Sequence, residues 1–326
     1  MKQIKAVLIF LLGLSTAVGL AFAIPEWGAS GGVLQSQITA KLAVVFIFFF
    51  QGLVLPIEEI HGVFRKVRVH TFVQLSIFIG YPILVFLAMW PLKGQMNPDI
   101  WLGFIYLSVL PTTVSTAVVY STTAGGNPAV ATFNVATANV IGIFIVPVVM
   151  AWIVSTKGVS IPIAPLLMRI ALLLFLPMLV GQILRGLSSK IREFVAKRRR
   201  WANRINTFMV YFIIYCVFSN AVMTGGWESL PREQLLIVLG LCVAFLCVAK
   251  SLSFAGVRFF RFSRADGISA FFCSAQKGLA AAVPMGESIF SGTDVTISLV
   301  LLPIMLYQPL MLFVGGIIAG VLHREA

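Results

Sequence analysis

The stretch FFCSAQKGLAAAVPM, residues 271–285, is the most informative part of the sequence, because it is a hydrophobic segment with a lysine near its centre. A lysine in the middle of a membrane span costs roughly 2.5–3.5 kcal/mol on insertion scales. Lys277 lies about ten residues from either end of the surrounding apolar segment, so we expect its side chain to face protein or water. Gly278 and Pro284 predict that the helix is interrupted here.

A second interrupted segment, LPTTVSTAVVYSTTAGGN, occupies residues 110–127. In this segment a cluster of hydroxyl side chains follows Pro111. Gln276 follows Thr112 by 164 residues (276 − 112), and half of the 326-residue chain is 163 residues. Two interrupted spans at corresponding positions of two halves are typical of inverted repeats in secondary transporters, with a binding site where the repeats meet.

The composition is that of an integral membrane protein. Of the 326 residues, 59% are apolar and 11% are charged, whereas a soluble domain has roughly 25% charged residues. The net charge of +13 does not indicate a nucleic-acid partner, because the basic residues lie mainly in short segments between apolar spans. The four cysteines fall within apolar segments and have no histidine beside them, so we expect no metal site.

Apolar segments long enough to span a membrane recur along the chain. We expect an all-α membrane protein of ten transmembrane helices, the fourth and ninth of them broken. Residues 1–155 would form the first five-helix repeat and residues 156–326 an inverted second repeat within a single membrane domain. The expected spans are residues 1–23, 40–56, 71–90, 99–124, 129–155, 163–184, 205–224, 234–257, 267–290 and 295–322.

The distribution of basic residues predicts the orientation of the chain. Seventeen lysines and arginines fall on the side of the N-terminus, and three fall on the opposite side, namely Lys93, Lys157 and Arg232. By the positive-inside rule, we expect both termini and the basic stretch 188–204 to be cytoplasmic, in the cell inner (plasma) membrane. We interpret this stretch between the repeats as an anchor on anionic lipid rather than a nucleic-acid site.

Polar side chains around the two breaks form the candidate substrate or ion site. Thr112, Ser115 and Thr116 are spaced i, i+3 and i+4, which predicts one shared helix face, and Pro111 frees a carbonyl nearby. The alternative is that these hydroxyls only pack and bond back to their own helix. The candidates are Thr112, Thr113, Ser115, Thr116, Asn127, Asn134, Ser274, Gln276 and Lys277, and the additional polar groups are Gln51, Asn220, Glu287 and Gln308.

Three other basic side chains lie near the predicted ends of spans, namely Lys41, Arg169 and Lys250. We expect them to extend toward an interface.

No enzyme motif is present in the sequence. There is no HExxH, GxSxG, acidic-pair or Walker motif, and the three histidines fall in predicted loops or the tail. We therefore expect a protein that is not an enzyme and carries no cofactor, with Na⁺ or H⁺ as the coupling ion of any transport. Such transport would be secondary or passive.

Several short motifs resemble one known family. These are residues 125–134 (GGNPAVATFN), 272–279 (FCSAQKGL), 283–285 (VPM), 50–53 (FQGL) and 307–309 (YQP). They are similar to the sodium/bile acid cotransporter 7 branch of the bile acid:sodium symporter superfamily. The resemblance implies a ten-helix fold with a panel domain and a core domain, in which spans four and nine unwind and cross. It also implies a substrate between the two domains.

The sequence departs from the well-understood symporters of that superfamily at their sodium site. Their ninth-span crossover carries a glutamate that helps to bind sodium, whereas the matching stretch here has no acid and has Lys277. Their fourth-span Ser-Asn pair falls on Thr116 and Ala117, so the asparagine is lost. An ammonium group near an emptied cation site would replace sodium and favour an anionic substrate, or proton coupling.

These observations predict a secondary transporter of an organic anion, sterol-like or otherwise amphipathic, that works by alternating access. Lys277 would face the cavity between the domains without a partner, so we expect Lys277→Met to leave expression intact. The alternative is a membrane regulator or receptor that keeps the fold and does not transport. The expected partners are the lipid bilayer and a small organic anion, with no nucleic acid, and the sequence does not indicate an oligomeric state.

Overall fold

The computed structural model describes residues 2–55, 63–113, 116–155, 163–226 and 231–324, and these residues contain helices and no β-strand. The elements η2 and η4 are π-helical, and η3 is a 3₁₀ turn. In chain order the elements are α1 (Lys2–Ala23), α2 (Pro25–Gly28), α3 (Ser36–Val54), α4 (Val67–Leu75), η2 (Ser76–Gly80), α5 (Tyr81–Met89), η3 (Trp90–Leu92), α6 (Pro98–Val109), α7 (Thr116–Thr123), α8 (Pro128–Ser155), α9 (Ile163–Ile170), η4 (Ala171–Phe175), α10 (Leu176–Leu187), α11 (Ser189–Met223), α12 (Arg232–Phe259), α13 (Arg264–Ser274), α14 (Leu279–Phe290) and α15 (Ile297–Arg324).

Within the described residues, seven continuous helical stretches are long and apolar enough to cross a membrane. Two shorter apolar helices, Leu8–Ala23 and Pro98–Val109, accompany them. The expectation of an all-helical membrane protein is therefore confirmed. The count of ten spans and the inverted repeat stay predictions. The seven long stretches are Ser36–Val54, Val67–Leu92, Pro128–Val154, Ala164–Leu187, Trp201–Met223, Glu233–Phe259 and Ile297–His323.

Both predicted breaks are present. The helix α6 ends at Val109 and α7 begins at Thr116, while α13 ends at Ser274 and α14 begins at Leu279. Leu110 is extended (φ −61°, ψ 143°), as expected for a residue that precedes a proline. Because residues 110–113 are not helical, the prediction that Thr112 shares a helix face with Thr116 is wrong.

Side-chain caps explain where the broken helices begin. Asn97 Oδ1 accepts a hydrogen bond from the backbone amide of Asp99 at 2.9 Å, and Pro98 occupies the first turn of α6. Ser263 Oγ accepts from the amide of Asp266 at 3.3 Å at the start of α13. Each half-helix thus starts with a satisfied amide and points its C-terminal end at a break.

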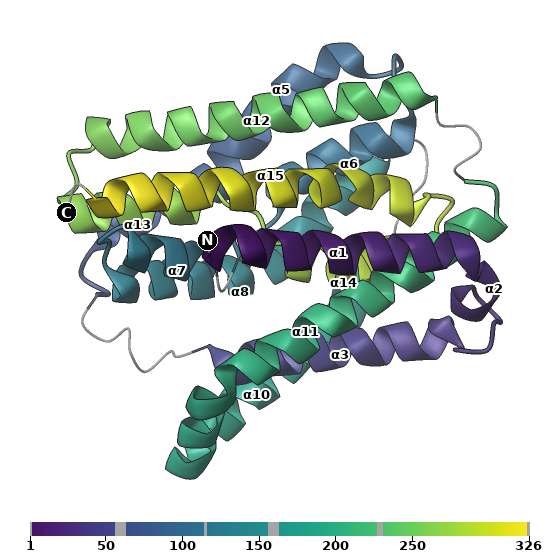
Figure 1. Cartoon of the computed structure of the whole chain (residues 1–326), viewed down its shortest axis with the longest axis horizontal. Helices are drawn as coiled ribbons and strands as arrows, with labels where there is room; N and C mark the ends of the chain where they lie inside the picture. Colours follow the sequence, from purple (N-terminus) through teal and green to yellow (C-terminus); the bar gives the residue numbers. More distant parts are fainter. Residues whose placement is uncertain (1, 56–62, 114–115, 156–162, 227–230, 325–326) are drawn as a thin grey trace.

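The helices pack as two groups, each of which takes helices from both halves of the chain (Figure 1). In the first helix group, α1 to α3 and α9 to α11, α3 packs on α10 and α11, and α1 packs on α11. In the second helix group, α4 to α8 and α12 to α15, α6 packs on α15, and α13 packs on α7, α8 and α12. The two groups meet where α1 contacts α15, α11 contacts α14 and α8 contacts α9.

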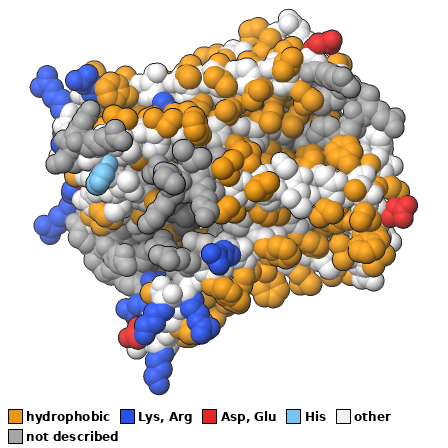
Figure 2. All heavy atoms as spheres, viewed as in Figure 1, with side chains coloured by type: hydrophobic (Ala, Val, Ile, Leu, Met, Phe, Trp, Pro, Cys, Tyr) orange, Lys and Arg blue, Asp and Glu red, His pale blue; other side chains and the backbone are white. Residues whose placement is uncertain are grey.

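The molecular surface is apolar around its middle and basic at one end. Figure 2 shows hydrophobic side chains over the body of the bundle and most of the lysines and arginines at one end. Large apolar side chains such as Leu12, Leu87 and Leu236 are exposed. Many exposed apolar side chains on this face suit contact with lipid.

The basic stretch 188–204 is helical rather than a loop between the repeats. Ser188 caps α11 by accepting a hydrogen bond from the amide of Ile191. Ile191 and Val195 then pack against Val54 at the end of α3. The helix is interrupted only at Arg198, whose backbone is non-helical (φ −107°, ψ 15°). Apolar contacts with α3 therefore order a segment whose polar composition suggests a loop.

Candidate functional site

The two breaks lie against each other. The backbone amide of Gly278 donates to Pro111 O at 3.0 Å. Gln276 Oε1 accepts hydrogen bonds from Thr113 Oγ1 and Thr116 Oγ1, each at 3.0 Å, and these two hydroxyls also bond to each other. The side chains and the backbone of the two broken spans therefore form one polar cluster inside the second helix group.

Lys277 is the most completely satisfied polar residue of this cluster. Its side chain is 1% exposed. Its Nζ donates to Ser108 O at 2.6 Å, to Leu110 O at 2.9 Å and to Ile77 O at 3.4 Å. It also lies 4.8 Å from the centre of the Tyr81 ring, within the range of a cation–π contact. The ammonium group thus sits in a cage of three backbone carbonyls and one aromatic face.

Two of these carbonyls are available because α6 ends here. The last carbonyls of a helix have no intrahelical donor, and the chain beyond Val109 is extended, so Ser108 O and Leu110 O need partners from elsewhere. The C-terminal end of a helix also carries a partial negative charge, which favours a cation. Pro111 has no amide hydrogen to offer. The break in span four therefore creates a cation-binding end, and Lys277 fills it.

The third carbonyl is available because of the π turn η2. The amide of Tyr81 donates to Ser76 O, five residues back, as in a π-helix. The next residue, Pro82, has no amide hydrogen, so Ile77 O receives a bond from neither residue 81 nor residue 82. Lys277 Nζ supplies a donor to this carbonyl at 3.4 Å.

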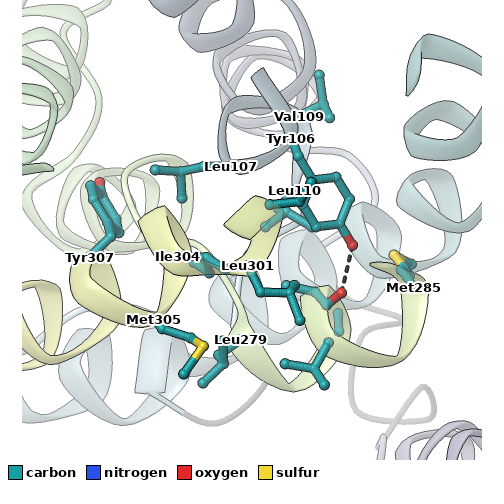
Figure 3. Close-up of a cluster of buried hydrophobic side chains, with 14 of the residues drawn as sticks. Tyr106, Leu107, Val109, Leu110, Leu279, Met285, Leu301, Ile304, Met305 and Tyr307 are labelled. Carbon is teal, nitrogen blue, oxygen red and sulfur yellow. Dashed lines mark hydrogen bonds between the residues drawn. The ribbon is translucent and has the colours of Figure 1, made fainter. Parts of the chain in front are cut away.

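The hydrophobic packing around the crossing holds the two broken spans together. Figure 3 shows Tyr106 and Leu110 of the fourth span beside Leu279 and Met285 of the ninth, with α15 side chains next to them. Tyr106 Oη donates to Ala282 O at 2.6 Å, from α6 to α14. Dense apolar packing around the polar cluster fixes its geometry and keeps water out.

This geometry corrects one expectation about Lys277. We expected an unpaired ammonium facing the space between two domains, but the structure places it among acceptors from η2 and from the end of α6, all in the second helix group. The expectation of an unpaired charge is therefore wrong. The reason is that backbone carbonyls released by a helix break are invisible in the pattern of side chains.

Within the two breaks themselves, residues 110–113 and 275–278, two side-chain atoms are buried and have no hydrogen-bond partner among the described residues. They are Gln276 Nε2 and Thr112 Oγ1. Thr112 also contributes its backbone oxygen, which accepts from Asn139 Nδ2 at 3.1 Å. Unpaired buried donors are costly, so these two groups are the ones in the cluster that a bound molecule would satisfy.

The remaining candidates at the breaks lie elsewhere or are not described. Ser115 lies outside the described residues. Ser274 Oγ bonds to Ser253 Oγ at 3.0 Å and back to Ala270 O, and it lines a small cavity of about 70 Å³ between α12 and η2. Asn134 accepts from Gln74 Nε2 on α4. Neither Ser274 nor Asn134 contacts the Gln276 cluster through a hydrogen bond that we observe in the described residues.

Asn127 belongs to a structural cluster at the start of α13. Its Oδ1 caps α8, and its Nδ2 donates to Asp266 Oδ1 at 3.4 Å. Lys66 Nζ reaches both carboxylate oxygens of Asp266 at 2.7 Å. Asp266 precedes the expected span 267–290. Burial raises the pKa of its carboxyl, but the hydrogen bonds from Lys66, Ser263 and Asn127 and the charge of Lys66 outweigh this effect, so the pKa lies below its ordinary value.

The four additional candidates are dispersed. Gln51 on α3 and Gln308 on α15 are buried, and each has a side-chain oxygen without a partner among the described residues. Asn220 Oδ1 accepts from the amide of Ser30 at 2.7 Å and so ties α11 to the segment after α2. Glu287 is half-buried on α14.

Glu287 interacts electrostatically with two cations of the first helix group, Arg169 on α9 and Lys41 on α3. Arg169 Nη1 also donates to Ser291 O at 3.4 Å, just after α14. The hydrogen bond from Arg169 to Ser291 is thus a polar contact between the two helix groups.

Sequence reasoning missed the environment of Lys250. The prediction that its side chain extends to an interface is wrong, because it is 7% exposed and its Nζ has no hydrogen-bond partner among the described residues. The nearest observed groups are the rings of Phe271 and Phe272, with centres 4.8 and 5.3 Å from Nζ. The aromatic pair Phe271-Phe272 was the available signal, since a cation beside two rings of a neighbouring span can be held by them.

The sequence did not indicate that Asn139 contacts Thr112 or that Gln74 contacts Asn134. Among the residues that the structure describes, no three His, Cys, Asp or Glu side chains come together in a way that could hold a metal ion.

Broken helices that cross inside an apolar, lipid-facing bundle define a polytopic helical membrane protein of the transporter class. Residues 9–324 match the SBF-like CPA transporter family, and the chain belongs to this family. The resemblance to the bile acid:sodium symporter superfamily is thereby confirmed.

Several relatives of this chain are named as transporters. The chain is 28% identical to "Putative symporter YfeH" of Escherichia coli over 325 residues, which cover all of this chain and 96% of that protein. It is also 28% identical to "Sodium/bile acid cotransporter 7" of Mus musculus, over 95% of this chain and 90% of the mouse protein. The protein of the same name from Danio rerio is 28% identical over 95% of this chain and 91% of its own length.

Proposed function

We propose that this membrane transporter moves an organic anion by alternating access and that Lys277 takes the place of a coupling cation. The observation that carries the proposal is the carbonyl cage around the Lys277 ammonium, at the contact between two broken spans. The bacterial relative is named a symporter and the mouse relative a cotransporter. A fixed positive charge at this point would perform, without an ion from solution, the neutralising role that a bound cation performs at such a crossing.

The charge of the crossing favours an anion. In this proposal Lys277 is protonated, its described hydrogen bonds are accepted by neutral carbonyls, and Gln276 Nε2 lacks a partner within the described residues. A carboxylate about 6 Å from the ammonium is attracted by about 3 kcal/mol at an effective dielectric constant of about 20. This corresponds to about 100-fold in affinity. The apolar surroundings suit an amphipathic, sterol-like anion such as the bile acid in the name of the mouse relative.

Sodium does not fit the crossing. Sodium would need oxygen ligands, but Ser108 O and Leu110 O already bind the ammonium, and the remaining oxygens of Thr113, Thr116 and Gln276 are neutral. A sodium ion about 6 Å from the ammonium would be repelled by about 3 kcal/mol. We therefore propose that transport does not depend on sodium, and that protons are the coupling ion if coupling exists.

The two helix groups supply the moving parts of the proposal. The first helix group corresponds to the panel and the second to the core that the resemblance implies, and the crossing lies in the second. The groups meet along α1–α15, α11–α14 and α8–α9, and movement along these contacts would expose the crossing to either side in turn. Arg169 and Ser291 form one polar contact that such a movement would break.

Binding and flux measurements on the purified protein test the proposal. We expect organic anions, bile acids first, to raise the unfolding temperature equally in sodium and potassium buffers, and binding to weaken at high pH as Lys277 loses its proton. Proteoliposomes should then accumulate the anion that binds. A tenfold preference for sodium in isothermal titration would contradict the cation role of Lys277 and make Glu287 the first residue to examine.

Flux also separates transport from the alternative class. A regulator or receptor with this fold would bind the anion and show no uptake above protein-free liposomes. Lys277→Glu should introduce sodium sensitivity, because it exchanges the ammonium for the acid of the related symporters. Lys250→Met is the matched control for a buried lysine, and we expect it to leave the sodium response unchanged.

The orientation is part of the same proposal. We propose that both termini and residues 188–204 are cytoplasmic in the inner membrane, which the concentration of basic side chains at one end supports (Figure 2). Reporter fusions at Gly225 should read as external. A cytoplasmic signal there would contradict the proposed topology and the inverted second repeat.

A further inference from the structure

The N-terminal part of α11 forms a basic arm, which we define as residues 189–204. The helix α11 has 35 residues, which corresponds to about 52 Å at 1.5 Å per residue, whereas the hydrocarbon core of a bilayer is about 30 Å thick. Only Trp201–Met223 has the composition of a membrane span. Residues 189–200 of the arm therefore lie beyond the hydrocarbon, and the joint between the arm and α10 projects from the rest of the bundle (Figure 1).

Two sides of the arm are apolar, and only one of them is covered. On the covered side, Val195 and Ala202 pack with Val54 of α3. On the other side, Phe194 is 56% exposed and Trp201 is 62% exposed, seven residues apart. Trp201 is the first residue of the span, so the exposed apolar surface at Trp201 continues into the exposed apolar surface of the span.

The same arm carries a dense positive charge. Lys190, Lys197, Arg198 and Arg204 are exposed, against one exposed acid, Glu193. The guanidinium group of Arg198 lies 4.5 Å from the centre of the Phe194 ring. Figure 2 shows basic side chains clustered on this projecting tip. An exposed aromatic face flanked by basic side chains is typical of a helix that lies in the interface of an anionic membrane.

We propose that the basic arm binds the headgroups of anionic phospholipids, with Phe194 and Trp201 inserted at the level of the headgroups. The kink at Arg198 lies within the arm, three residues before the span, so the part of the arm before the kink follows the membrane surface while Trp201–Met223 crosses the bilayer. Because the arm packs on α3, lipid bound there holds the first helix group in the membrane. This inference rests on the surface of the arm and is independent of the transported substrate.

An acidic lipid fits the arm better than a nucleic acid does. Both would contact the basic side chains, but only a membrane also accommodates the exposed rings of Phe194 and Trp201. These rings lie next to the start of a lipid-embedded span, where aromatic residues suit the interface. Charge and apolar surface together therefore indicate a lipid surface.

The test uses the full-length protein in detergent, titrated with phosphatidylglycerol or phosphatidylcholine. In the arm variant Lys190, Lys197 and Arg204 are all changed to Gln. The matched control variant changes Arg65, Arg258 and Arg261 to Gln, three exposed residues outside the arm, and so removes the same charge. Each basic side chain near an anionic surface contributes roughly a factor of five in affinity, so we expect the arm variant to bind phosphatidylglycerol about 100-fold more weakly.

The control variant should keep most of the phosphatidylglycerol affinity, and phosphatidylcholine should bind all three proteins equally weakly. High salt should reduce the phosphatidylglycerol binding of the unchanged protein toward that of the arm variant. Equal losses in the arm and control variants, or no preference for phosphatidylglycerol, would overturn the proposal. Arm-dependent binding of duplex DNA that competes with phosphatidylglycerol at physiological salt would also overturn it.

Fluorescence tests the insertion without depending on affinity. Subtracting the emission of the Trp201→Phe variant from that of the unchanged protein gives the emission of Trp201 alone. Brominated phosphatidylglycerol should quench this difference. The same difference should be weakly quenched in the arm variant. An unquenched Trp201 in the unchanged protein would show that the aromatic face does not enter the headgroup layer.

Discussion

Two lysines are buried in the second helix group, and their hydrogen bonding differs. Lys277 is 1% exposed and donates to three backbone carbonyls. Lys250 is 7% exposed, and its Nζ contacts two aromatic rings and no acceptor within the described part of the chain. Both positions remove an ammonium group from water, which is costly unless hydrogen bonds replace the lost hydration. The cost is offset at Lys277 and largely not offset at Lys250.

This difference separates a buried charge that links parts of the fold through hydrogen bonds from a buried charge that does not. The Lys277 ammonium links the end of α6 to η2, so it contributes to the geometry of the crossing as well as to its potential. Lys250 contributes no observed hydrogen bond to the contact between α12 and α13. Burial alone therefore does not tell which lysine stabilises the fold, and the acceptors around the nitrogen do.

The largest expected effect is that of Lys277→Met on stability. The substitution removes three donors and leaves Ser108 O, Leu110 O and Ile77 O unpaired in an apolar interior, so we expect a loss of about 3 kcal/mol. The unfolding temperature in detergent should fall by several degrees, with reduced yield. This replaces the expectation of intact expression. A variant as stable as the unchanged protein would show that water or another donor reaches these carbonyls.

Lys250→Met is the matched comparison and should have the opposite sign. It removes a buried ammonium without an observed acceptor and keeps a side chain of similar length, at the loss of cation–π contacts with Phe271 and Phe272. We expect the protein to become more stable by about 1 kcal/mol, measured by the same thermal unfolding. A loss comparable to that of Lys277→Met would erase the distinction between the two lysines.

A third lysine extends the comparison to the partly exposed end of the bundle. Lys66 is 38% exposed and pairs with Asp266, so solvent screens the pair and Asp266→Asn should cost only about 1 kcal/mol. Because the pKa of the Asp266 carboxyl is lowered in the folded state, the pair stabilises the fold at pH values above the unfolded pKa of about 3.9. That stabilisation is lost as the pH falls through the lower folded pKa.

The pH dependence of the same variant supplies its control. The difference in unfolding temperature between the unchanged protein and Asp266→Asn should be constant near neutral pH and should shrink below about pH 4. If the difference stays the same in acid, the variant acts through the hydrogen bonds to Ser263 and Asn127 and not through the charge of Lys66.

The sequence predicted the breaks because their causes are local. Pro111 removes an amide hydrogen and Gly278 permits a non-helical backbone, each at its own position. The apolar residues on both sides of Lys277 indicate that it lies deep in a span. The partners of Lys277 could not be predicted, because they are backbone carbonyls whose availability depends on where helices end and on a π turn. Side-chain patterns do not report such groups. The prediction that Thr112 and Thr116 share a helix face failed because residues 110–113 are not helical, and Thr113 is the residue that bonds to Thr116.

Tertiary contacts account for the other errors. Lys250 was expected near an interface from its distance to the end of a span, but Phe271 and Phe272 of another span cover it. The sequence also did not indicate that the stretch 188–204 is helical, and the apolar surface of α3 against which it packs supports the helix. In both cases the residues that make the contact are far away in the sequence. One sequence alone does not show which distant residues come into contact.

Pro82, which follows the π turn η2, influences the environment of Lys277 through the backbone. A π turn holds one residue more than an α turn, and such a surplus can migrate along a helix when each amide can exchange one acceptor for the next. Pro82 has no amide to exchange, so the surplus stops there and Ile77 O stays uncommitted. In Pro82→Ala, residue 82 gains an amide that can donate to a backbone carbonyl such as Ile77 O. The π turn would then no longer be fixed in place. The protection of the new amide from hydrogen exchange would measure this change. The position of the Lys277 ammonium thus depends partly on the amide hydrogen that Pro82 lacks.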